Sequence, residues 1–157
     1  MPADTGLRAV FARTFAHPVR ADPVTFNPGV LLGAAVLTLI LIPLFGVVLS
    51  ILTCGKIAWV PPLCSAGALL AVSVFLAWMA MLPGLVLGAI LLAGGVSGWL
   101  LIAGLGLGNG ALLTLMLARQ LDALVIVGAG IGIVYALHFR LVVEMFRPDD
   151  GWWSRSR

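Results

Sequence analysis

Charge is the scarcest property of this sequence. Only 10% of its 157 residues are Asp, Glu, Lys or Arg, whereas 62% are hydrophobic; a soluble domain carries about 25% charged residues. No charged residue occurs between Asp22 and Lys56, and none occurs between Lys56 and Arg119. So few charges cannot cover a water-facing surface of this size. The sequence therefore predicts an integral membrane protein.

Groups that could perform chemistry are also scarce. The sequence has no nucleophile paired with a base, no phosphate-binding glycine loop and no metal-ligand cluster. His17 and His138 are the only histidines, and His17 lies outside the predicted membrane bundle, so we expect no haem, metal or other cofactor. No basic stripe with interleaved aromatic residues indicates a nucleic-acid partner. These absences predict a protein that is not an enzyme.

The long uncharged runs are what the sequence does contain. A helix needs about 20 apolar residues to cross the hydrocarbon core, and the runs accommodate four crossings, at about 29–53, 62–82, 85–105 and 121–143. The pair Pro83-Gly84 predicts a sharp turn. The glycine-rich run 104–110 predicts a break, after which 111–118 is either a re-entrant segment or part of the fourth helix. The predicted fold class is all-α, a polytopic antiparallel four-helix transmembrane bundle within residues 29–146.

Residues 1–28 predict an interfacial helix followed by a proline-rich linker. Between Asp4 and His17, helical spacing places four apolar residues on one face: Leu7, Val10, Phe11 and Phe15. Arg13 falls on the opposite side and Arg8 at the edge of the apolar face, a pattern typical of a helix that lies on a membrane. A tail with chance periodicity is the alternative.

Basic residues are concentrated towards the two ends of the chain. The N-terminal segment holds Arg8, Arg13 and Arg20, and the C-terminal segment holds Arg140, Arg147, Arg155 and Arg157, whereas the connections hold Lys56 and Arg119. The positive-inside rule places both termini, including the tail 147–157, in the cytoplasm. We therefore expect a multi-pass protein of a bacterial-type inner membrane, in contact with membrane lipids.

The two cysteines are the most specific local feature. Cys54 and Cys64 both lie in the loop after the first crossing, which is outside the cytoplasm in this topology, so a disulfide is chemically allowed. Two lipid-shielded thiols are the alternative. Within the first crossing, Pro43 removes a backbone donor and predicts either a hinge or a packing kink.

Glycines at small-xxx-small spacing predict close helix packing. The candidate pairs are Gly84/Gly88, Gly94/Gly98, Gly104/Gly108 and Gly128/Gly132. Packing against partners and packing inside one chain are both open. Near the end of the last crossing, Arg140, Glu144 and Arg147 can pair on one helix face. With Trp152 and Trp153 they are candidates for docking a cytoplasmic partner, and a solvated surface pair is the alternative.

Many packing signals and few chemical ones predict a non-catalytic helical subunit or scaffold of a larger inner-membrane complex. Its partners would be other membrane subunits or copies of itself. One alternative is a homo-oligomeric small channel or carrier lined by small polar groups, with candidates Ser50, Ser65, Ser73, Ser97, Asn109 and Thr114. A second alternative is a thiol-dependent assembly factor that uses Cys54 and Cys64.

Overall fold

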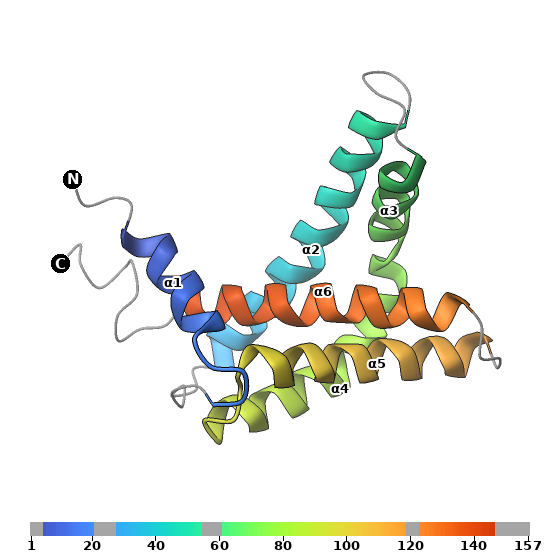
Figure 1. Cartoon of the computed structure of the whole chain (residues 1–157). Helices are drawn as coiled ribbons and strands as arrows, with labels where there is room; N and C mark the ends of the chain where they lie inside the picture. The colour runs from blue at the N-terminus through green and yellow to red at the C-terminus, as the bar shows by residue number, and fades with distance from the viewer. Residues whose placement is uncertain (1–4, 21–27, 55–60, 119–122, 147–157) are drawn as a thin grey trace.

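The computed structural model describes residues 5–20, 28–54, 61–118 and 123–146. These residues form six helices (Figure 1): α1 (Thr5–Phe15), α2 (Pro28–Thr53), α3 (Pro61–Val72), α4 (Val74–Ala93), α5 (Trp99–Ala118) and α6 (Ala123–Met145). Helices α2, α4, α5 and α6 are each long and apolar enough to cross a membrane, whereas α3 is shorter. The predictions of an all-α fold and of four membrane-crossing helices are confirmed at this level.

The turn predicted at Pro83-Gly84 is wrong, because Pro83 lies inside α4. Helix α4 ends instead at a glycine cap. Gly95 has a φ of 64°, its N–H donates to the Leu92 carbonyl (3.3 Å), and the N–H of Val96 donates to the Leu91 carbonyl (3.0 Å). Together these two bonds form a Schellman motif, which satisfies the last carbonyls of the helix and needs the left-handed conformation that glycine adopts freely.

Helix α5 also differs from its predicted range, because glycine again does not end the helix where a turn was expected. It runs continuously through the glycine-rich run that was expected to break the chain. Residues 111–118 are therefore the last turns of α5, and neither a re-entrant segment nor part of the last helix. Glycine lowers helix propensity by about 1 kcal/mol per residue, but close packing of two of these glycines against α6 compensates for that loss, as described below.

Ser73 divides the predicted second crossing, 62–82, into α3 and α4. Its Oγ donates to the Leu70 carbonyl (2.6 Å), and its N–H donates weakly to the same oxygen (3.3 Å). A serine that bonds back to the preceding turn competes with the helical hydrogen-bond pattern and bends the helix. The bend directs α3 away from the line of α4 (Figure 1).

The helices form two parts (Figure 1). Helices α4, α5 and α6 run side by side, and we call them the layer. Helices α2 and α3 pack together and project from the layer at a clear angle, and we call them the arm. The buried core lies where α2 crosses α4 and α6, and it contains Ala34, Ala35, Leu92, Phe139, Val142 and Val143.

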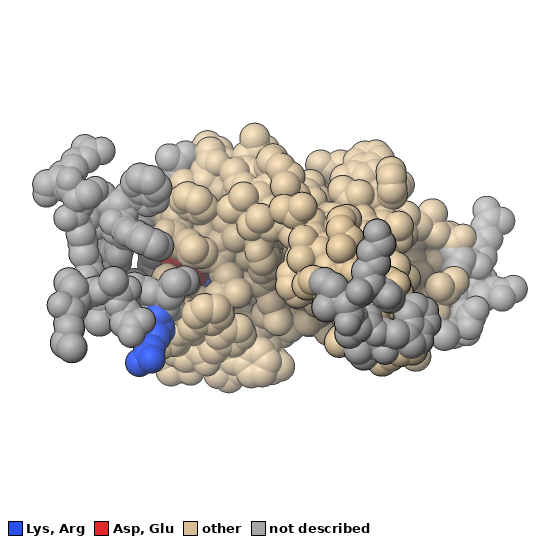
Figure 2. Space-filling view, turned by 90° about the horizontal axis from the view of Figure 1, so that it is seen from above, with Lys and Arg blue, Asp and Glu red and all other residues tan. Residues whose placement is uncertain are grey.

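Charge is confined to one end of the described chain. Among the described residues, charged types occur only in α1, in the segment that follows it and near the end of α6. On the face seen in Figure 2, blue and red atoms gather at the end that carries α1, and the remaining described surface is uncharged. The described arm, and the layer away from this end, therefore have uncharged and mainly apolar outer faces.

Candidate functional site

A closed seam joins α5 and α6 through four glycines. The helices approach so closely that a Cβ at Gly106 would clash with the Gly132 carbonyl, and a Cβ at Gly110 would clash with the Gly128 carbonyl. A Cβ at Gly128 would overlap the side chain of Thr114, whose hydroxyl donates to the Gly110 carbonyl (2.8 Å). Only glycine fits at these positions, because larger residues would force the two backbones apart.

The predicted glycine pairs differ in whether they contact another helix. Gly128 and Gly132 lie in the closed seam, but Gly104 and Gly108 face open space, with no heavy atom within 4 Å of their Cβ positions. The choice of that α5 pair is corrected to Gly106 and Gly110. A shift of two residues turns a helical position by about 200°, and spacing alone cannot say which of two glycine pairs faces a neighbour.

Two other predicted pairs do not join helices directly. Gly94 caps α4, and a Cβ at Gly98 would clash with the backbone of Pro18 and Val19. Gly84 and Gly88 on α4 line a groove; a Cβ at Gly84 would lie 3.0 Å from Asn109 Nδ2, and one at Gly88 would lie 3.9 Å from the Phe139 ring. In the arm, Gly46 and Gly67, which the sequence analysis did not select, bring α2 and α3 together. A Cβ at Gly67 would lie 2.8 Å from the Ser50 nitrogen.

The cysteine pair lies at the tip of the arm. Cys54 follows α2 and Cys64 lies in the first turn of α3, with their Cα atoms 5.0 Å apart and their sulfurs at disulfide-bonding distance. The bond and the glycine contact together make the arm a braced pair of helices. Pro43 lies inside α2, which continues through it.

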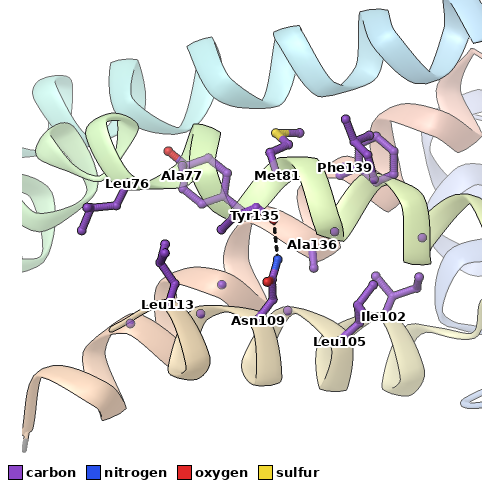
Figure 3. A pocket seen from close by; sticks show the side chains of 18 of the residues that line it. Leu76, Ala77, Met81, Ile102, Leu105, Asn109, Leu113, Tyr135, Ala136 and Phe139 are labelled. Atoms are coloured by element: carbon purple, nitrogen blue, oxygen red, sulfur yellow. Dashed lines mark hydrogen bonds between the residues drawn. The ribbon is translucent and has the colours of Figure 1, made fainter. Parts of the chain in front are cut away.

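A groove of about 120 Å³ separates α4 from α5 and α6 (Figure 3). It is partly open to the molecular surface, and its lining is almost entirely apolar. Small residues on the α4 side are Ala77, Ala80, Gly84 and Gly88, and larger side chains on the opposite side include Ile102, Leu105, Leu113 and Phe139. The polar side chains in the lining are Asn109, Thr114 and Tyr135.

The hydrogen bonds of these polar side chains leave one donor and one acceptor of Asn109 without a partner among the described residues. Ser73 uses its one hydroxyl hydrogen for the Leu70 carbonyl. Tyr135 must therefore be the donor in its 2.9 Å contact with Ser73 Oγ. Asn109 Nδ2 donates one hydrogen to the Ala80 carbonyl, the dashed line in Figure 3. Its second N–H and its Oδ1 have no partner within the described part of the chain.

The ion pair near the end of α6 is buried. The Arg140 Nη1 and Glu144 Oε1 atoms are 2.6 Å apart, and the two residues are 1% and 5% exposed. Arg140 Nε also donates to the Ser97 carbonyl (3.2 Å), which ties α6 to the turn between α4 and α5. The expectation of an exposed pair that offers itself to a partner is corrected, because these two side chains are enclosed by the chain itself.

The N-terminal segment covers this end of the layer. The N–H groups of Gly98 and Leu100 donate to the carbonyls of Val19 and Pro18, each at 3.1 Å. Phe15 of α1 contacts Trp99 with ring centroids 6.3 Å apart. The other docking candidates, Arg147, Trp152 and Trp153, lie outside the described residues.

A polar contact between α2 and α6 holds the arm to the layer. Thr38 Oγ1 on α2 lies 3.1 Å from His138 Nδ1 on α6, and Thr38 is fully buried. The sequence gives no local signal for this contact, because Thr38 and His138 are 100 positions apart. The described residues hold no group of three or more His, Cys, Asp or Glu side chains that could bind a metal ion.

Comparison of the chain with protein-family models, curated protein sequences and solved structures gives no significant match.

Proposed function

We propose that this chain is a non-catalytic helical subunit or scaffold of a larger complex in a bacterial-type inner membrane, and that it acts by packing against other membrane helices. The arm is the observation that carries the proposal. It is braced internally by Gly46, Gly67 and the cysteine pair, yet it projects from the layer (Figure 1). A braced element with apolar outer faces is suited to holding a partner.

The direction of the arm strengthens this argument. Membrane-crossing helices tilt on average by about 20° from the bilayer normal. Because the arm and the layer point in clearly different directions (Figure 1), both cannot lie close to the normal. A neighbouring helix packed against the arm would stabilise it at a large tilt. Exposed side chains such as Ile40 (57%) and Phe45 (60%) on α2 offer the contact surface.

The proposed topology is antiparallel, with successive crossings running in opposite directions and both termini in the cytoplasm. It is supported by the basic residues of both ends and by the contacts that bring the start of α5 and the end of α6 to the same end of the layer as α1. In this topology α1 lies along the membrane surface. Its half-exposed Phe11 and Phe15 would enter the lipid, and Arg8 would reach the head groups.

Site-specific photo-crosslinking in cells tests the proposal. A photoreactive amino acid is placed at Ile40 or Phe45 of the arm, and in a matched control at Ile126 on α6, which is 77% exposed. We expect the arm positions to give adducts with another membrane protein and the control position to give lipid adducts. Native mass spectrometry after mild extraction should show the same partner. Lipid adducts from all three positions, together with a lone monomer, would contradict the proposal.

The same preparation separates the two alternative functions. Adducts only with a second copy, together with solute flux in reconstituted liposomes, would favour a homo-oligomeric channel or carrier. The thiol-dependent alternative is favoured by the cysteine pair. Under this alternative, a Cys54→Ser/Cys64→Ser variant would still crosslink to its partner, but the host complex would lose its activity. A purely structural brace predicts that the assembled complex stays active.

A further inference from the structure

We propose that the groove between α4 and the α5–α6 pair binds one end of an uncharged lipid alcohol, a long hydrocarbon chain with a single hydroxyl group. The hydroxyl would bond to Asn109, and the chain would lie among the small residues of α4. This binding role is independent of the arm and of any protein partner.

The size and lining of the groove select an apolar ligand. An engineered apolar cavity of about 150 Å³ stays dry and binds small hydrocarbons, and this groove, at about 120 Å³, is similar in volume. Sites for whole drug-sized molecules measure about 300–1,000 Å³. The groove therefore holds the end of a longer molecule, and the remainder leaves through its open side into the surrounding hydrocarbon.

The free hydrogen-bonding positions select a hydroxyl group. Asn109 offers one acceptor, Oδ1, and one remaining N–H after its bond to Ala80. A hydroxyl both donates and accepts, so it can satisfy either position or both, whereas an ether or ketone oxygen only accepts. The Tyr135 hydroxyl already donates to Ser73, so Asn109 is the polar group of the lining that the ligand hydroxyl would contact. Unpaired polar groups in an apolar site favour a ligand that supplies the missing bond.

The position of Asn109 excludes lipids with large head groups. It lies midway along α5, which runs from Trp99 to Ala118, and so at mid-membrane depth if α5 crosses the bilayer. The lining contains no charged residue, and a phosphate or carboxylate would be costly at that depth. A chain whose only polar group is one hydroxyl can reach Asn109.

Photolabelling of the full chain tests the inference in phosphatidylcholine nanodiscs. The probe is hexadecan-1-ol with a diazirine in its chain, and labelled residues are mapped by mass spectrometry. We expect adducts on groove residues such as Met81 and Leu113. Unlabelled hexadecan-1-ol should compete about tenfold better than hexadecyl methyl ether, which can only accept from the remaining N–H, and the ether should compete better than hexadecane, because one hydrogen bond of about 1.4 kcal/mol gives a tenfold ratio.

Two variants separate the hydroxyl contact from the apolar one. Asn109→Leu should make the alcohol, the ether and hexadecane compete equally, because it removes both polar positions. Ala80→Leu should block labelling altogether by filling the groove, and Ala68→Leu on the exposed face of α3 is the matched control. Adducts spread over the outer faces of the helices, or equal competition by alcohol and ether in the unmodified chain, would overturn the inference. Neither result depends on a protein partner, so the proposed function is tested separately.

Discussion

One seam joins α5 to α6 and a second separates this pair from α4; both contain small residues, yet the first is closed and the second is open. In the closed seam, Gly106 and Gly110 meet Gly128 and Gly132 backbone to backbone. In the open seam, large side chains lie beside the small residues on both sides of the groove, Met81 and Leu85 on α4 and Leu105 and Phe139 on α5 and α6. Backbone-to-backbone contact requires small residues that face each other on both helices, with no large side chain between them.

The open seam is secured by polar contacts at separate points along its length. Arg140 connects α6 to the carbonyl of Ser97 in the turn between α4 and α5. Asn109 adds a hydrogen bond to Ala80 near the middle of α5. Polar contacts between membrane helices contribute about 0.6–2 kcal/mol each. We therefore expect the open seam to depend on a few polar side chains, and the closed seam on the absence of side chains.

The largest effect is expected from breaking the polar anchor of the open seam. Arg140→Met should lower the free energy of unfolding by about 3–5 kcal/mol, because Glu144 would lose the cation it is buried against. Thermal unfolding in detergent, followed by circular dichroism, measures the change.

The double variant Arg140→Met/Glu144→Leu is the control for this effect. It removes both charges, so it should recover much of the loss, since apolar pairs of similar volume often replace buried ion pairs at little cost. If the double variant were as unstable as Arg140→Met, the loss of the Arg140 charge beside Glu144 would not be the cause.

An intermediate effect is expected in the closed seam. Gly106→Ala and Gly132→Ala should each destabilise by about 1–3 kcal/mol, because the added methyl meets the backbone of the other helix. Gly104→Ala and Gly130→Ala lie on the same helices but face open space, and they should leave the unfolding temperature unchanged or slightly higher. Equal effects in both sets would mean that the two helices are not in backbone contact.

The smallest effect is expected where the open seam receives one methyl group. Gly88→Ala places a Cβ 3.9 Å from the Phe139 ring, which is ordinary van der Waals contact. We expect a gain of about 0.4–1 kcal/mol from the reduced freedom of the unfolded chain. A loss as large as that of Gly106→Ala would show that the groove closes in the membrane, and the distinction between the two seams would then fail.

The ends of the helices show where sequence reasoning succeeded and where it did not. The range predicted for the first crossing, 29–53, agrees closely with α2, because charges and prolines bound that run. The middle crossings were misplaced because Pro83-Gly84 and Gly94-Gly95 are both plausible turns. Only Gly95 has the hydrogen bonds and the positive φ of a helix end. A proline can remain inside a membrane helix because its neighbours can satisfy the freed carbonyl.

The candidate sites were predictable to different degrees. The cysteine pair was recognisable because both residues lie in one short loop. Asn109 was considered only as a possible pore-lining residue, because its partner Ala80 is 29 positions away. The same holds for Thr38 and His138, which are 100 positions apart. Contacts of this range carry no local signal in a single sequence.

The sequence by itself determined that the chain contains runs long and apolar enough to cross a membrane, because the transfer of uncharged runs of this length into hydrocarbon depends on composition alone. Only the tertiary structure decided which glycines meet and which charges are buried. Those outcomes depend on the rotation of each helix about its axis. In a uniformly apolar helix hydrophobicity does not fix this rotation, so packing against the neighbouring helices sets it.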